Sequence, residues 1–125
     1  MTVTSILVVL VALQAKHLVC DFLLQTPFMH TNKGKYGHPG GLLHAGLHGA
    51  GTFLVLLGFA TGLWAALAVS LAEALFHYHV DWTKEQIGDR YRLTVSTAGY
   101  WAIFGLDQAV HQWTYVVIAG LTGSL

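Results

Sequence analysis

Most of this chain consists of four long apolar runs, and no other feature of the sequence restricts the fold as much. The runs cover residues 3–25, 42–60, 63–82 and about 98–120. A helix of roughly 20 residues crosses the hydrocarbon core of a bilayer. Hydrophobic residues make up 54% of the chain and charged residues 10%, whereas soluble domains carry about 25% charged residues. The sequence therefore predicts an all-α fold, a four-helix transmembrane bundle in which residues 1–125 form one integral membrane domain.

Bulk charge and cysteine content narrow the expected partners. The 6 basic and 6 acidic residues cancel, so we expect the lipid bilayer as partner and no nucleic acid. Cys20 is the single cysteine, so no disulfide can form within the chain, and we interpret it as a small buried hydrophobic residue. The first run has no basic segment before it and no A-x-A cleavage motif, which favours a membrane span over a cleaved signal peptide.

The distribution of basic residues predicts an orientation in the membrane. The loops predicted at 26–41 and 83–97 contain Lys33, Lys35, Lys84, Arg90 and Arg92, and the other connection and both termini contain no Lys or Arg. The positive-inside rule then places these two loops in the cytoplasm and both termini outside the cytoplasmic (inner) membrane. Lys16 lies within the first run, and we interpret it as snorkelling toward an interface.

Each apolar run carries titratable residues four positions apart. That spacing stacks side chains on one face of a helix, about 6 Å apart along its axis. The pairs are His17 and Asp21, His44 and His48, His77 and Asp81, and Asp107 and His111, with Glu73 one turn before His77. Ionisable residues inside apolar helices are costly and usually functional. Because the predicted topology places all four pairs in the cytoplasmic half, we expect one shared polar site. Any single pair is equally well explained as a structural ion pair.

The residue types in these pairs predict a metal centre. Neutral imidazole and carboxylate groups are ligands for Zn, Fe or Mn. The candidate ligands are His17, Asp21, His44, His48, His77, Asp81, Asp107 and His111. One ion needs fewer ligands than this, so the surplus favours two divalent metal ions that share a bridging carboxylate or water.

Other polar residues are candidates for catalysis and substrate binding. Glu73 is the candidate general base, or else a further ligand, and Gln25, Lys84 and Gln108 are candidates for binding an anionic group of the substrate. We interpret His30 and His38 as solvated loop residues, and His79, on the face opposite His77, as a packing residue. The H-x-x-x-H motif lacks the glutamate of zincin proteases, and its spacing differs from that of ferritin-like di-iron bundles.

Four motifs carry a resemblance to a known family. They are His17-x-x-x-Asp21-Phe22-x-Leu24-Gln25 with Lys33 downstream, Leu43-His44-x-x-x-His48, His77-x-x-x-Asp81-x-x-Lys84, and Asp107-Gln108-x-x-His111. In this order, over nearly the whole chain, the sequence resembles the DUF3307 family of small bacterial and phage integral membrane proteins of unknown function. The resemblance implies a multi-span membrane protein with these polar residues as its signature, and it implies no particular reaction.

The predicted function is a metal-dependent hydrolase that acts on a phosphate or acyl ester of a lipid-like substrate. Two alternatives stay open: a transporter or sensor of divalent metal ions or protons, and a di-iron redox enzyme. A membrane protein that holds no metal is a further alternative. The small residues Ala45, Gly46, Gly49 and Gly51 would permit close helix contact, so we include a homo-oligomer among the expected assemblies.

Overall fold

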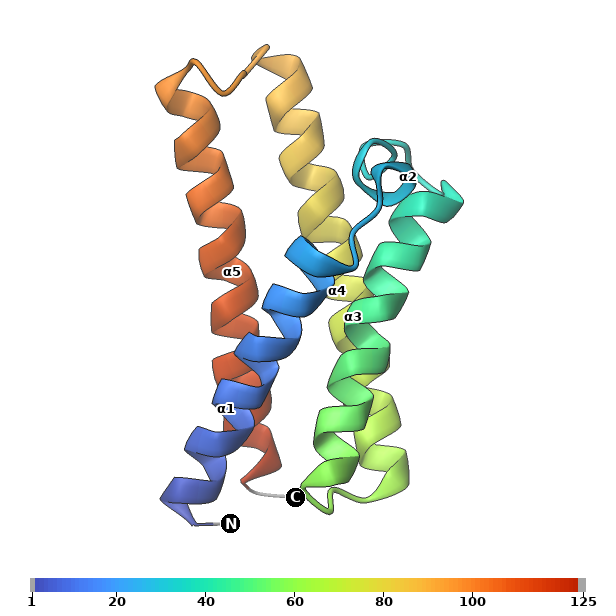
Figure 1. The fold of residues 1–125 in the computed structure, drawn as a ribbon, viewed down its shortest axis with the longest axis vertical. Coiled ribbons are helices and arrows are strands. Elements are labelled where there is room, and N and C mark those ends of the chain that lie inside the picture. Colours follow the sequence, from blue (N-terminus) through green and yellow to red (C-terminus); the bar gives the residue numbers. More distant parts are fainter. Residues whose placement is uncertain (1, 124–125) are drawn as a thin grey trace.

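The computed structural model describes residues 2–123, and within this range the protein is all-α. α1 (Val3–Leu18) continues directly into a π-helical turn, η1 (Val19–Leu23), and the short α2 (Pro27–His30) follows. Three long helices complete the fold, namely α3 (Pro39–Gly58), α4 (Leu63–Arg90) and α5 (Ala98–Thr122) (Figure 1). The predicted all-α class is therefore confirmed for these residues, which contain no strand.

The long helices form a bundle in which α1 begins and α5 ends at the same end of the molecule (Figure 1). α4 and α5 extend beyond α1 at the opposite end, where α2 also lies. An apolar core fills the end at which α1 begins: Val9, Leu13, Leu56, Ala66, Tyr115, Ile118 and Ala119. The titratable pairs lie on the other side of this core from the end at which α1 begins. They follow the core residues in α1 and α4 and precede them in α3 and α5. The fold therefore separates an apolar layer from a polar layer.

Two glycines of α3 allow its neighbours to approach closely. A Cβ atom at Gly49 would lie 2.9 Å from Cβ of Ala74 and 3.1 Å from the carbonyl oxygen of Ser70, both on α4. A Cβ atom at Gly51 would lie 2.6 Å from Cγ of Lys16 on α1. The small residues expected to mediate helix contact are thus used within one chain at these two positions.

Several helix ends differ from the sequence-based prediction. α4 ends at Arg90 instead of near Trp82, because residues 83–90 contain helix-forming Lys, Glu and Gln and no proline to stop the helix. The prediction treated their polarity as the mark of a loop. α3 begins at Pro39, before the predicted start at 42, because proline suits the first turn and the His38 side chain accepts a hydrogen bond from the Gly40 amide. The predicted loop at 26–41 also contains α2.

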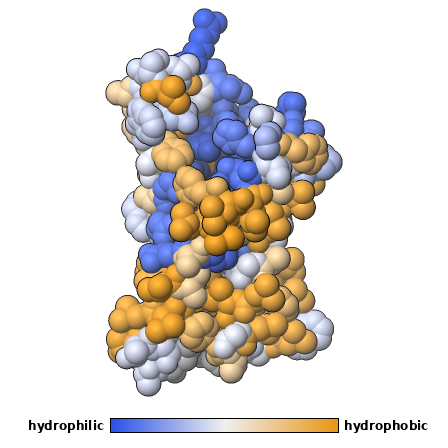
Figure 2. Space-filling view, in the orientation of Figure 1, coloured by the Kyte–Doolittle hydropathy of each residue, from blue (hydrophilic) through white to orange (hydrophobic). Residues whose placement is uncertain are grey.

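Three helical segments are long and apolar enough to cross a membrane: Val3–Leu23, Pro39–Gly58 and Leu63–Arg90. α5 has 25 residues and is not among them, because Asp107, Gln108, His111 and Gln112 lower its mean hydropathy. Large apolar side chains cover much of the outer surface, with Trp64 at 78% and Leu54 at 69% exposure. Figure 2 shows that this apolar surface dominates the end at which α1 begins, whereas hydrophilic residues gather toward the opposite end.

Candidate metal centre

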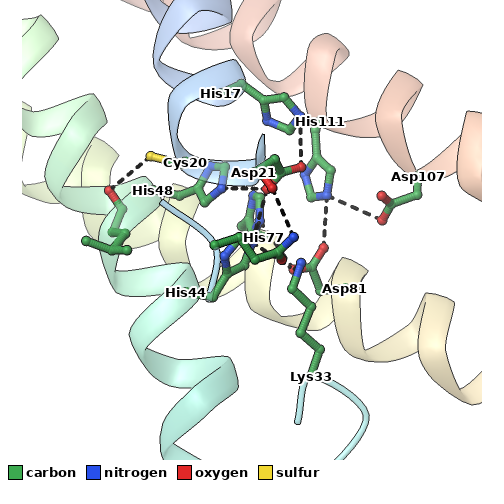
Figure 3. A network of polar contacts seen from close by, with 12 residues as sticks. His17, Cys20, Asp21, Lys33, His44, His48, His77, Asp81, Asp107 and His111 are labelled. Atoms are coloured by element: carbon green, nitrogen blue, oxygen red, sulfur yellow. Dashed lines mark hydrogen bonds and ion pairs between the residues drawn. The ribbon is translucent and has the colours of Figure 1, made fainter. Parts of the chain in front are cut away.

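Five histidines and three aspartates meet in the polar layer of the bundle. They come from α1 and η1, from α3, from α4 and from α5, and their side chains point toward one another (Figure 3). All eight candidate ligands belong to one network of contacts: His17, Asp21, His44, His48, His77, Asp81, Asp107 and His111. Every imidazole in this network directs its Nε2 atom at a carboxylate, and seven of the eight residues are buried.

The centre of the network is a triangle of three potential ligand atoms. Nε2 of His44 lies 3.3 Å from Nε2 of His77 and 3.3 Å from Oδ2 of Asp81. The third side, from His77 Nε2 to Asp81 Oδ2, measures 3.4 Å. A tetrahedral ion with bonds of about 2.0–2.1 Å holds its ligand atoms about 3.3 Å apart. The three atoms therefore have the mutual spacing of three ligands on one metal ion.

Asp21 lies beside this triangle and belongs to the π-helical turn. In η1 the Leu24 amide donates to the Val19 carbonyl 2.9 Å away, five residues back, and such turns often occur at functional sites. Asp21 Oδ1 lies 2.9 Å from His48 Nε2 and 3.1 Å from His44 Nε2, and Oδ2 lies 3.1 Å from His17 Nε2. Asp21 therefore links three histidines from two helices.

The α5 residues approach the triangle from its other side. His111 Nε2 lies 3.2 Å from Asp81 Oδ1 and 3.4 Å from Asp107 Oδ1. The potential ligand atoms form two groups, and within each group they lie within 4.8 Å of one another. The first group is Asp21, His44, His48 and His77, and the second is His77, Asp81 and His111, so His77 belongs to both. Gln108 joins the two sides, since its Nε2 donates to Asp107 Oδ2 at 3.2 Å and its Oε1 lies 3.0 Å from His17 Nε2.

A lysine from the α2–α3 loop completes the site. Lys33 is 5% exposed, and its Nζ lies 3.0 Å from Asp81 Oδ2, the same oxygen that belongs to the ligand triangle. The loop is tied to α4 by hydrogen bonds from Gln86 Nε2 to the Gly34 carbonyl and from the Gly37 amide to the Tyr78 hydroxyl. Sequence reasoning used Lys33 for topology and within the family motif, and it assigned no contact to it.

A buried ion pair, formed by Lys16 and Glu73, lies next to His48. Lys16 Nζ donates to Glu73 Oε1 at 3.1 Å and to the Tyr115 hydroxyl at 3.3 Å, and it lies 3.4 Å from His48 Nδ1. The expectation that Lys16 snorkels to an interface is wrong: Lys16 is 8% exposed, because Gly51 leaves room for its aliphatic stem. Glu73, the candidate general base, is linked to the cluster through Lys16, and within residues 2–123 it makes no hydrogen bond to any of the eight candidate ligands.

Tyr115 is a residue of the site that the sequence-based prediction missed. Its hydroxyl lies 2.9 Å from His17 Nδ1, and its side chain is 1% exposed. The signal was available in its position, four residues after His111 on the same helix face. A tyrosine in an apolar run is unremarkable by itself, because its ring packs as a hydrophobic group.

The other residues singled out in the sequence lie outside the ligand network. Gln25 Nε2 donates to the Asp21 carbonyl at 2.9 Å, and Lys84 pairs with Glu85 at 3.2 Å. His79 is exposed, and its Nε2 lies 3.0 Å from the Tyr36 hydroxyl. Cys20 is buried, with its Sγ 3.8 Å from the Leu47 carbonyl.

These features define a class of protein: an all-α chain with three helices able to span a membrane and a buried cluster of histidines and carboxylates that could hold a metal ion. The chain belongs to the DUF3307 family, described as a protein of unknown function, whose family model matches residues 9–124. No curated protein and no solved structure matches the chain.

Proposed function

We propose that this protein is an integral membrane hydrolase that depends on a divalent metal ion held by His44, His77 and Asp81. The observation that carries the proposal is the triangle of donor atoms with sides of 3.3, 3.3 and 3.4 Å. Zinc enzymes commonly hold their ion by three protein ligands and leave a position open for water or substrate. A divalent ion in such a site supplies Lewis acidity and lowers the pKa of bound water.

The charges around the triangle support a resident divalent cation. Three buried or nearly buried carboxylates, those of Asp21, Asp81 and Asp107, lie in the network, and Lys33 pairs with one of them. Lys16 and Glu73 compensate each other. A cluster of carboxylates favours a bound cation, because buried negative charge is costly unless it is compensated. A second ion, as expected from the surplus of ligands, fits best together with an anionic substrate.

The surface supports insertion of all four long helices in a membrane. The apolar outer surface and the three candidate spans favour a membrane environment. We propose α5 as the fourth span, since its polar residues Asp107 and His111 face the cluster and are buried there. The exposed basic residues Lys35, Arg90 and Arg92 lie at the polar end of the bundle, which under the positive-inside rule faces the cytoplasm.

The surrounding residues differ in their suitability as proton acceptors. Asp21 is the least buried carboxylate of the network, with its side chain 10% exposed, and it lies 3.1 Å from His44 Nε2. Glu73 is held by Lys16 behind His48. We therefore propose Asp21 as the direct proton acceptor and Glu73 as a residue that acts through Lys16.

Metal content of the purified protein tests the proposal. Wild type in detergent is expected to carry stoichiometric Zn, Fe or Mn by mass spectrometry, and Asp81→Asn and His77→Gln are expected to lose it. His79→Gln is the matched control, because it changes a histidine on the same helix that points away from the cluster. A wild type that stays metal-free after reconstitution overturns the metal site. A metal-loaded protein whose hydrolysis of single-chain phosphate and acyl esters equals that of Asp81→Asn overturns the hydrolase.

Transport of protons or divalent ions is the second candidate, because buried polar atoms continue from the cluster toward the apolar end. Glu73 Oε2, Ser70 Oγ and Thr52 Oγ1 are buried and have no hydrogen-bond partner among residues 2–123. Thr52 follows His48 by four residues, and Ser70 precedes Glu73 by three, so both lie one turn closer to that end. Uptake of the bound metal or of protons into liposomes that contain the pure protein would favour this candidate over hydrolysis.

A further inference from the structure

A groove along the seam between α4 and α5 contains two cavities. The larger, about 370 Å³, is walled mainly by apolar side chains: Phe76, Val80, Ile87, Ile103, Leu106 and Val110. Its volume falls in the range of about 300–1,000 Å³ that is usual for small-molecule sites. The smaller, about 200 Å³, lies toward the apolar end and includes Val69, Val117 and Leu121. Phe76 lines both cavities, so the two hollows adjoin along one seam.

The larger cavity reaches the proposed metal centre. Asp107 lines it and is 5% exposed, and its Oδ1 lies 3.4 Å from His111 Nε2. Asp107 accepts from Gln108 Nε2 through Oδ2 and lies against His111 through Oδ1. A carboxylate oxygen can accept more than one hydrogen bond, so Asp107 can also accept one from a hydroxyl group of a ligand in the cavity. The cavity therefore suits a ligand whose polar head carries a hydroxyl group.

The polar end of the same cavity carries a cation. Lys84 lines it, toward the polar end of the bundle, and its ammonium group also pairs at 3.2 Å with Glu85, a partly exposed neighbour that does not line the cavity. A phosphate group interacts favourably with a lysine ammonium group in a partly dry site. In the proposed topology, this places an anionic head at the cytoplasmic interface and an apolar chain toward the bilayer centre. A lipid in the cytoplasmic leaflet has this orientation.

We propose that the α4–α5 groove binds a single-chain glycerophospholipid from the surrounding membrane. Its hydrocarbon chain lies along the seam past Phe76, its phosphate contacts Lys84, and its free glycerol hydroxyl donates to Asp107. The bound lipid would have its head group beside His111 and would be the substrate of the proposed hydrolase. That second part of the inference rests on the proposed function.

Binding of a stable analogue to the metal-free protein tests the groove separately from the chemistry. The probe is 1-hexadecyl-glycerol-3-phosphate, whose chain is attached by an ether bond and so offers no acyl ester to hydrolyse. It is titrated by native mass spectrometry after treatment with a chelator, which also prevents metal-dependent hydrolysis of its phosphate ester. Val110→Trp fills the groove and is expected to weaken binding by about tenfold or more. Val116→Trp is the matched control, because Val116 is an exposed valine on the same helix that lines neither cavity.

The head group is tested with Lys84→Gln. This variant is expected to weaken binding of the phosphate probe by about tenfold, while leaving binding of uncharged 1-hexadecyl-glycerol unchanged. Equal binding of the phosphate probe to wild type, Val110→Trp and Lys84→Gln would overturn the groove, even if metal analysis supports the metal site. If the expected binding pattern is found in a protein that never takes up metal, lipid binding in the groove is supported and the proposal of a metal-dependent hydrolase is overturned.

Discussion

At the scale of single residues, the most informative contact is the one between Lys33 and Asp81. Lys33 places its ammonium group 3.0 Å from Asp81 Oδ2, and His44 and His77 direct their Nε2 atoms at the same oxygen from 3.3 and 3.4 Å. A metal ion in the triangle and the lysine ammonium would share one carboxylate oxygen. If the triangle holds a divalent ion as proposed, Lys33 is a tethered cation that repels that ion.

Removal of this cation is expected to tighten metal binding. Lys33→Gln should lower the dissociation constant of the bound divalent ion by about tenfold or more. A tenfold change corresponds to about 1.4 kcal/mol. The repulsion between an ammonium group and a neighbouring divalent ion is larger than this at an effective dielectric of about 20. Competition with a metal indicator in detergent measures the change. Lys35→Gln is the control, because Lys35 is exposed on the same loop and bonds to Asn32. Weaker metal binding by Lys33→Gln would contradict the repulsive role.

A second residue-scale prediction concerns the buried pair of Lys16 and Glu73. Lys16→Met leaves the Glu73 carboxylate buried without its partner, which typically costs about 3–5 kcal/mol. We expect the double variant Lys16→Met with Glu73→Gln to recover most of that loss, because it removes both charges. Unfolding in mixed detergent measures the free energies. Additive losses in the two single variants and the double variant would show that the pair does not stabilise the fold.

At the scale of helices, the helical repeat made the faces that carry the candidate ligands predictable, whereas contacts between distant segments were not predictable. The pairs His77 and Asp81 or Asp107 and His111 lie on one face because of the 3.6-residue repeat, whatever the helix packs against. The position of Lys16 depends on Gly51 of another helix, and Lys33 enters from a loop. Such contacts arise only from the assembled fold, so a single sequence offers no local signal for them.

Close packing of α3 against α4 gives a prediction at the same scale. Gly49→Ala is expected to destabilise the protein by about 1–3 kcal/mol, as overpacking usually does, because the added Cβ would lie 3.1 Å from the Ser70 backbone oxygen. Gly46→Ala, one turn earlier, meets nothing within 4 Å and should be neutral or slightly stabilising, since alanine favours helix. Thermal unfolding in detergent compares the two. Equal midpoints would mean that α3 and α4 are not in close contact.

At the scale of the whole molecule, the polar residues of α5 decide how the topology is interpreted. Hydropathy alone leaves α5 out of the candidate spans, because it counts Asp107 and His111 as if they faced lipid. In the structure these side chains are 5% and 2% exposed; His111 contacts Asp81 of α4, and Asp107 contacts His111 within the bundle. A helix whose polar residues are satisfied inside a bundle can cross a bilayer despite a low mean hydropathy.

Accessibility of single cysteines distinguishes four spans from three. In a Cys20→Ala background, we expect Ser5→Cys and Gly123→Cys to react with a membrane-impermeant maleimide on intact cells, and Arg92→Cys to react only after permeabilisation. If α5 does not cross the membrane, Gly123→Cys follows Arg92→Cys instead of Ser5→Cys, because both ends of α5 then lie on one side. That outcome would leave Asp107 and His111 on a helix outside the bilayer core. The α4–α5 groove could then no longer align a lipid chain with the bilayer, although the proposed metal triangle, whose three residues lie on α3 and α4, would be unaffected.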